Sequence, residues 1–210
     1  MTKKNTHYYF EKIKRIQTLA EIGLEHSPNT FDKERYLELR QISLEMMEHM
    51  TDVPVEKIVP VIEEKQGYKT PKTDVRAVVF NEKGQILLVQ EKADSCWAMP
   101  GGWSDIGYSP AEVAEKECME EAGLAVKAVK LLAVMDKQKQ NMPPAFEYVY
   151  KIFLLCKKTG NELSTGSETD DACWFDEDNL PELSAPRNTA AILKMMFEFY
   201  RGERTEPYFD

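Results

Sequence analysis

The residues best suited to chemistry are three glutamates, Glu117, Glu120 and Glu121, within residues 101–124. At about 100° per residue on a helix, Glu120 and Glu121 fall within roughly 60° of Glu117, so the three carboxylates share one face. Like charges so close together destabilise a helix unless something binds them. Carboxylate oxygens are ligands that Mg²⁺ prefers. The pattern therefore indicates a Mg²⁺ site, with Mn²⁺ as the alternative ion and a solvated acidic face as the alternative interpretation.

Local signals define the helix that carries these glutamates. Ser109 is a typical N-cap, Pro110 fits the first helical position, and Glu112 completes a capping box. Gly123 supplies the residue at which the helix ends. Small residues recur along one side and would let the helix pack closely against a sheet: Ala111, Ala114, Cys118 and Ala122. The sequence thus predicts a helix over residues 109–122.

Two glycines, Gly101 and Gly102, lie shortly before this helix. Glycine lets the backbone approach a ligand closely, so backbone groups here can reach a metal ion or a phosphate. We expect both glycines to bind substrate. Gly101 is also an expected backbone ligand of the metal, beside Glu117 and Glu121 as primary ligands and Glu120, which completes the site.

Residues 102–124 resemble the Nudix box. Its pattern is Gly, five residues, Glu, seven residues, then Arg-Glu-apolar-x-Glu-Glu-x-Gly-apolar. The matching positions are Gly102, Glu117, Cys118, Glu120, Glu121, Gly123 and Leu124. Tyr108 stands where the family has its first Glu, which puts in doubt that residue's role in the loop or at a peripheral metal. Lys116 replaces the family Arg, keeping a charge that can orient a neighbouring carboxylate but losing the bidentate fork.

This resemblance implies a Mg²⁺-dependent hydrolase that cuts the diphosphate linkage of a nucleoside diphosphate conjugate. The implied fold is α/β, a Nudix α/β/α sandwich with a mixed sheet. A bound metal ion would lower the pKa of a water molecule and align it for attack on phosphorus. Lys116 is one expected catalytic residue, and either Glu120 or Glu168 would act as the general base. All three histidines precede residue 50, so a histidine base in the catalytic part is excluded.

Glu168 enters the site because residues 167–175 resemble the loop and strand that bring another carboxylate to the metals in related enzymes. A surface acidic loop is the alternative. Arg187 lies in a turn that resembles the one before the family's last helix, and we expect its role to be structural.

Four aromatic residues could stack on a nucleobase: Trp97, Trp103, Tyr148 and Tyr150. We select Trp97 and Tyr148 as substrate-binding residues. Each of the four rings could instead belong to the core or to an interface.

A helical preface ahead of this hydrolase part resembles a Gram-positive bacterial subgroup of Nudix enzymes, and within it the CDP-choline pyrophosphatase type. CDP-choline is therefore the expected substrate, cleaved to CMP and phosphocholine. The alternatives are an ADP-ribose pyrophosphatase, 3′–5′ exonucleolytic trimming of RNA, and a non-catalytic Nudix-fold sensor. The basic residues near the N-terminus could contact RNA, although a solvated helix face explains them more simply: Lys3, Lys4, Lys12, Lys14 and Arg15.

Hydrophobic periodicity divides the chain into a small all-helical N-terminal domain, residues 1–70, and a Nudix hydrolase domain, residues 71–210. Apolar residues at helical spacing predict helices over residues 8–24, from an Asp32 cap to Met50, and after Pro54. Residues 67–73 read as a linker. Two β-rich runs at 75–80 and 85–89, joined by four turn-forming residues, predict a hairpin. Further strands are expected at 129–135, 147–156 and 173–175, and a last helix at 189–200.

Composition fixes the broad class. Of 210 residues, 42% are hydrophobic and 30% charged, and the formal net charge of −9 disfavours broad binding to nucleic acid. No apolar run approaches the roughly 20 residues of a membrane span. With a polar N-terminus and four irregularly spaced cysteines, expected to be reduced and mostly buried, the sequence predicts a cytoplasmic protein.

Aromatic and methionine residues in excess of what a small helical unit can bury predict a homodimer formed through residues 1–70.

Overall fold

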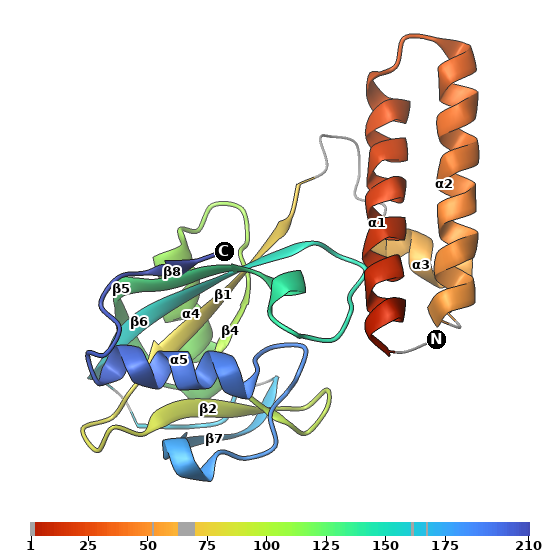
Figure 1. Ribbon diagram of the computed structural model, residues 1–210. Helices are drawn as coiled ribbons and strands as arrows, with labels where there is room; N and C mark the ends of the chain where they lie inside the picture. Colours follow the sequence, from red (N-terminus) through yellow and green to blue (C-terminus); the bar gives the residue numbers. More distant parts are fainter. Residues whose placement is uncertain (1–2, 52, 63–69, 161, 167) are drawn as a thin grey trace. The chain divides into compact units, whose positions relative to one another are not determined.

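The computed structural model describes residues 3–51, 53–62, 70–160, 162–166 and 168–210. The chain forms two compact units (Figure 1). The first contains Met1–Pro71 together with Pro144–Tyr148, and the second contains Lys72–Pro143 and Val149–Asp210. Nothing in the sequence pattern predicts that a short segment from the middle of the chain groups with the N-terminal helices. In the described ranges, no helix has the length and apolar character needed to cross a membrane.

The N-terminal unit is built on an antiparallel helical pair. Its helices are α1 (Lys3–His26), α2 (Thr30–Thr51) and α3 (Val55–Ile62). The break between α1 and α2 lies at residues 27–29, within the gap left between the two predicted helices, but the predicted Asp32 cap is wrong. Asn29 caps α2 instead, because its side chain accepts a hydrogen bond from the Phe31 amide at 2.9 Å and the helix has already begun by Asp32. The small core consists of Phe10, Ile13, Leu44, Met47 and Ile58.

A buried lysine joins Pro144–Tyr148 to α1. The Lys14 Nζ donates to the carbonyl of Ala145 at 2.6 Å and to that of Glu147 at 3.2 Å, and it lies 4.2 Å from the centroid of the Tyr148 ring. The Phe146 ring packs against Phe10. Lys14 is only 2% exposed, so the prediction of a solvated basic face is wrong at this residue.

Two sheets form the centre of the hydrolase unit. Its elements are β1 (Lys72–Val79), β2 (Ile86–Glu91), β3 (Trp97–Ala98), β4 (Gly101–Trp103), α4 (Pro110–Ala122), β5 (Ala125–Asp136), η1 (Lys137–Lys139), β6 (Val149–Gly160), β7 (Thr169–Phe175), η2 (Glu177–Asn179), α5 (Ala190–Tyr200) and β8 (Tyr208–Phe209). The larger sheet has the order β4-β1-β6-β5-β8, with β1 parallel to β6 and antiparallel to β4. The smaller, antiparallel sheet has the order β3-β2-β7.

The predicted hairpin between β1 and β2 is wrong, although its turn forms. The Asn81 side chain accepts hydrogen bonds from the backbone amides of Lys83 and Gln85, and Gly84 adopts a positive φ of 79°. Beyond a single bridge between Phe80 and Ile86, the two strands enter different sheets. The predicted linker also ends early, because β1 begins at Lys72. Residues 63–69, which include the start of that linker, lie outside the described residues.

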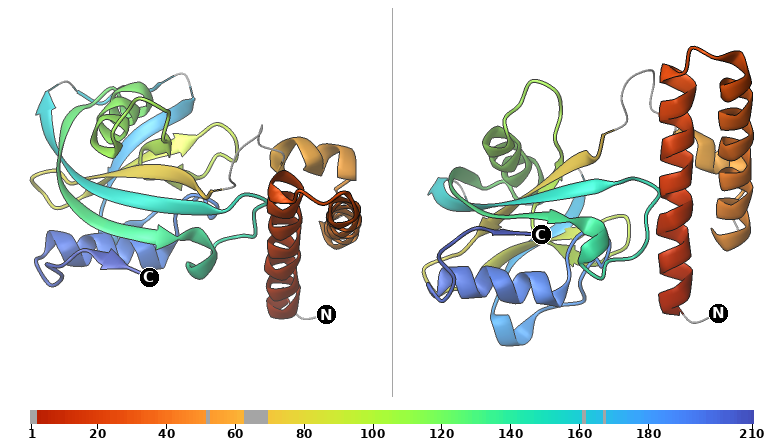
Figure 2. Two further views of the ribbon diagram at one scale, coloured as in Figure 1. Left: turned by 90° about the horizontal axis from the view of Figure 1, so that it is seen from above. Right: turned by 45° about the horizontal axis from the view of Figure 1, so that its top comes forward.

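Helices cover both faces of the two sheets (Figure 2), which confirms the predicted α/β/α sandwich with a mixed sheet, preceded in the sequence by a helical region. Successive residues of a strand point to opposite faces of the sheet, so they pack in turn against one helix or the other. Val75, Leu87 and Val89 pack with Ala114, Cys118 and Ala122 of α4, so most of the predicted small-residue stripe is buried. Val78, Ile86 and Leu88 pack with Leu193, Met196 and Phe197 of α5.

Candidate active site

The glutamate-bearing helix α4 is fixed at both ends by its own sequence. The Ser109 hydroxyl accepts from the Glu112 amide, and the Glu112 carboxylate accepts from the Ser109 amide at 2.8 Å, which closes the predicted capping box. Gly123 ends the helix in a left-handed conformation with φ 63°. These contacts fix where the three glutamates stand along the helix. Tyr108, just before the cap, is half exposed and takes part in a turn through its amide and the Asp105 carbonyl.

The two glycines lie against two of the glutamates. The Gly101 amide donates to Oε2 of Glu121 at 2.9 Å, and a Cβ on Gly102 would come within 3.0 Å of Oε1 of Glu117. Gly101 has φ 148°, and a Cβ there would lie 2.0 Å from the Val75 carbonyl oxygen, so only glycine fits between β1 and the helix. The structure thus brings these four predicted site residues together.

Glu120 is held differently. Its Oε2 accepts from Nζ of Lys116 at 2.8 Å, and the same ammonium lies 3.9 Å from Oε1 of Glu117. Glu120 is the most exposed of the three carboxylates, with 55% of its side chain accessible. Lys116 therefore stands between two of the glutamates, where the family Arg would be, and contacts each through a single nitrogen.

Burial makes the acidic face costly to ionise. It raises the pKa of Glu121 to about 8, because the Gly101 amide and the Arg76 guanidinium offset only part of the desolvation. Burial also raises the pKa of Glu117, with Lys116 opposing and the Glu120 charge adding to the effect. A divalent cation would favour the ionised forms of both carboxylates.

The loop that carries Glu168 is attached to the same helix. The Thr169 hydroxyl donates to the Glu121 carbonyl at 2.6 Å and accepts from the Gly166 amide at 3.1 Å. Gly166 lies so close to α4 that a Cβ there would fall 1.8 Å from the Glu120 carbonyl oxygen. Glu168 itself is exposed, and its charge acts on both Glu117 and Glu91. The predicted fourth carboxylate therefore lies close enough to Glu117 for the two charges to interact.

Sequence reasoning missed Glu91, a buried carboxylate at the end of β2. A register irregularity between Gln90 and Glu91 marks this point of the β2–β7 pair. Arg187, expected to be structural, ion-pairs with Glu91 at 2.6 Å and with Asp94 at 3.3 Å. Burial raises the pKa of Glu91, although the Arg187 and Arg76 charges oppose the rise. No sequence signal identified Glu91, because a charged residue ending a strand usually faces solvent.

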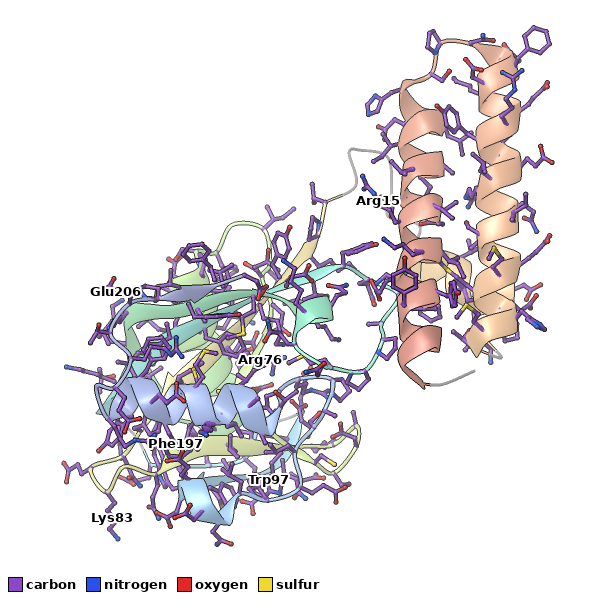
Figure 3. The ribbon with its side chains drawn as sticks, viewed as in Figure 1. Arg15, Arg76, Lys83, Trp97, Phe197 and Glu206 are labelled. Atoms are coloured by element: carbon purple, nitrogen blue, oxygen red, sulfur yellow. The ribbon has the colours of Figure 1, made fainter. Side chains whose placement is uncertain are left out.

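The predicted base-stacking residues lie in different places. The Trp97 ring packs edge-on against Phe175 at 4.8 Å, in the core beneath α5 (Figure 3). Tyr148 belongs to the compact unit of the N-terminal helices. Trp103 and Tyr150 are each about half exposed, on β4 and β6. Trp103 directly follows the two glycines and is the exposed ring nearest to them along the chain.

The donor set suits a hard divalent cation. The side-chain groups gathered here are carboxylates, whose oxygens are ligands that Mg²⁺ takes together with water and substrate phosphate. Among the described residues, no three His, Cys, Asp or Glu side chains converge into a complete cage. Glu120 is turned to Lys116 and Glu121 to the Gly101 amide, so rotation of these side chains would be part of binding a metal ion.

Comparison with known proteins agrees with this arrangement. Residues 70–196 match the NUDIX domain, and residues 8–62 match a domain described as UDP-X-like, N-terminal oligomerisation domain. A putative ADP-ribose pyrophosphatase, YjhB, of Bacillus subtilis (strain 168) is 44% identical over 202 residues, which cover 96% of this chain and 97% of the relative.

Two solved structures agree with these matches. A crystal structure of a UDP-X diphosphatase shares 32% identity with a TM-score of 0.63, covering 98% of this chain and 99% of the other. An ADP-ribose pyrophosphatase from Streptococcus suis 89-1591 shares 44% identity with a TM-score of 0.61, covering 67% of this chain and all of the other.

The chain belongs to the Nudix hydrolase family. It is a Nudix pyrophosphohydrolase, a class of enzyme that hydrolyses phosphorus-containing anhydrides in nucleoside diphosphate conjugates with the help of a divalent metal ion.

Proposed function

We propose that this enzyme hydrolyses the diphosphate linkage of CDP-choline with Mg²⁺, releasing CMP and phosphocholine. The observation that carries the catalytic part is the contact of Gly101 with Glu121 and of Gly102 with Glu117, which aligns two carboxylates with a glycine backbone. Glu117 and Glu121 would hold the ion, with Glu120 and the Gly101 backbone completing the site. When bound, the ion neutralises the diphosphate and activates a water molecule.

The chain's own groups then have separate roles. The exposed carboxylates Glu120 and Glu168 are the two candidates for the general base, since an accessible carboxylate can take a proton from water and pass it to solvent. Lys116, between Glu117 and Glu120, fixes both carboxylates and contributes positive charge near the phosphates. Trp103 is the candidate for stacking on the base, because its exposed ring follows the glycines, whereas Trp97 packs against Phe175 and Tyr148 belongs to the N-terminal unit.

We choose CDP-choline because the domain order, a helical segment followed by the hydrolase domain, resembles that of the CDP-choline pyrophosphatase type. ADP-ribose is the second candidate. Two relatives at 44% identity are described as ADP-ribose pyrophosphatases, which favours ADP-ribose, and a UDP-X diphosphatase is similar over nearly the whole chain. The decisive test is a screen of CDP-choline, ADP-ribose and UDP-sugars with Mg²⁺ or Mn²⁺, coupled to a phosphatase that reports monoester products. Preferential turnover of CDP-choline supports the proposal. If kcat/KM is higher for another conjugate, that compound replaces CDP-choline as the substrate.

We also propose that residues 1–70 form a helical domain that makes the protein a homodimer, while residues 71–210 form the hydrolase domain. The match of residues 8–62 to an oligomerisation domain supports this. So does a row of apolar side chains on α2, Leu39, Ile42 and Met46, each more than 40% exposed. Light scattering should give a dimer for the wild type and a monomer for Ile42→Glu, whereas Lys33→Glu on the same helix should stay dimeric. A monomeric wild type at micromolar concentration refutes the dimer.

The proposed location is the cytoplasm. All four cysteines are free thiols, which is typical of a reducing compartment. Two of them, Cys118 and Cys156, are buried, and the other two are partly exposed. The expectation of mostly buried thiols therefore holds for half of them.

A further inference from the structure

Residues 99–101, here called the pre-box segment, are held by buried side chains from three separate elements. The Met99 amide donates to Oδ1 of Asn188 at 2.9 Å, and the Met99 carbonyl accepts from Nη1 of Arg76 at 3.1 Å. The Gly101 amide donates to Oε2 of Glu121 at 2.9 Å. The Pro100 carbonyl accepts from the Ala77 amide at 2.8 Å. Together these contacts fix the backbone of residues 99–101, which includes Gly101 and directly precedes Gly102.

Arg76 is the centre of this arrangement. It lies on β1 inside the hydrolase unit, 5% exposed, and its Cα is the register partner of Gly101 (Figure 3). Its Nε and Nη2 donate hydrogen bonds to the Asp74 carboxylate at 2.8 and 3.2 Å, and its Nη1 donates to the Met99 carbonyl. Only a guanidinium offers donors in a fixed fork that can serve a carboxylate and a carbonyl together. The Arg76 charge also acts on Glu121 and Glu91.

We propose that Arg76 is a positioning residue for hydrolysis: it fixes the pre-box segment so that Gly101 and Gly102 meet the carboxylates of Glu121 and Glu117. Asn188 fixes the same segment from the turn before α5. Neither residue contacts the reacting atoms in this role. Removing either one takes away one of the two side-chain contacts that hold the Met99 backbone, so the glycines can shift relative to α4. Displacements of about 1 Å at an active site cost up to roughly a hundredfold in rate.

Lys151 provides a matched control. It is fully buried on β6 and contacts Asp74 at 2.5 Å from the other side, so its loss disturbs the same buried ion cluster. No contact described for Lys151 reaches the pre-box segment. Lys151→Met should therefore lower the melting temperature while kcat stays near that of the wild type. Arg76→Lys keeps the charge and loses the fork, so it should lower kcat by about tenfold or more with a smaller change in KM.

The test compares the full-length wild type with Arg76→Lys, Asn188→Ala and Lys151→Met. For each protein it measures kcat, KM and the melting temperature. It also measures the Mg²⁺ concentration at which half of the metal-induced rise in melting temperature is reached. We expect the first two variants to lower kcat and weaken the Mg²⁺ response, and Lys151→Met to lose only stability. If Arg76→Lys behaves like Lys151→Met, with a lower melting temperature but an unchanged kcat and Mg²⁺ response, Arg76 is a structural residue and the proposal is overturned. Should Arg76→Lys not fold, Asn188→Ala decides by the same comparison.

The inference rests on the proposed function only for the choice of substrate. If the wild type cleaves no CDP-choline, the proposed substrate is wrong, and kinetics move to the conjugate that it does cleave. The Mg²⁺-dependent melting temperature needs no substrate, so it still decides whether Arg76 and Asn188 hold the site in a metal-binding arrangement.

Discussion

Replacing Glu121 by Gln should make the metal-free protein more stable, and increasingly so as the pH rises. Glutamine has nearly the same shape and can still accept the Gly101 amide, but it carries no charge to bury. Glu121 is 6% exposed and its pKa is about 8, against an ordinary value of 4.5. The folded protein therefore binds a proton that the unfolded chain releases between these two pH values. Wild-type stability should fall as the pH rises from about 4.5 to 8, and then level off.

The pKa difference sets the size of the effect. If fully realised, it corresponds to about 5 kcal/mol between the low-pH and high-pH limits. Well below the unfolded pKa of 4.5, Glu121 is protonated in both the folded and the unfolded chain, so the two proteins should be equally stable. At about pH 8 and above, Glu121→Gln should exceed the wild type by a few kcal/mol, which for a unit of this size is roughly 5–10 °C in melting temperature.

Thermal unfolding without metal, measured across this pH range with and without millimolar Mg²⁺, provides the assay. Added Mg²⁺ should stabilise the wild type more at high pH, where the metal relieves the buried charge, and should have little effect on Glu121→Gln. Glu120→Gln on the same helix is the control, because it removes a carboxylate that is 55% exposed instead of the buried one. A Glu121→Gln variant that is less stable than the wild type by the same amount at every pH would refute the reasoning.

Three further outcomes are expected. Glu117→Gln should lower kcat by at least about a hundredfold while the melting temperature does not fall; full activity at saturating Mg²⁺ would remove Glu117 from the metal site. Gly166→Ala should destabilise the fold by several kcal/mol in denaturant unfolding, on the order of 3, because its Cβ would lie 1.8 Å from a backbone oxygen of α4. Gly160→Ala, whose Cβ would meet only Ala125 at 3.9 Å, is the control, and equal losses in the two variants would contradict the packing argument. Ser109→Ala should cost about 1 kcal/mol through the lost cap, and an unchanged unfolding midpoint would show that the cap does not stabilise α4.

The catalytic helix could be predicted well because its signals are local. Ser109, Pro110 and Gly123 lie within one turn of its ends, and each acts on backbone groups next to it. The three carboxylates then share a face by helical geometry alone. Glu168 could be predicted only through resemblance, because its place beside α4 depends on contacts of Gly166 and Thr169 across more than forty residues of chain.

Other features could not be predicted because they depend on strand pairing far along the chain. β1 pairs with β6, more than seventy residues later, rather than with the neighbouring β2, and a local hairpin signal contains no information on that choice. The cluster of Asp74, Arg76 and Lys151 follows from this pairing. Charged residues in a strand ordinarily predict a solvent-facing side. The sequence alone therefore does not predict that Arg76 is buried and holds the pre-box segment, which becomes clear only when the strand pairing is known.

Because Pro144–Tyr148 groups with the N-terminal helices, a single truncation point does not separate the two units cleanly. A cut near residue 71 removes Phe10 and Lys14, and leaves behind the Phe146 ring and two carbonyls that those residues cover. Apolar surface and unpaired backbone would then be exposed on the remaining fragment. The helical preface is therefore not an exchangeable module bounded by one junction. A chimaera that grafts it onto another Nudix core must transplant both Met1–Pro71 and Pro144–Tyr148 to keep the graft's own interior intact.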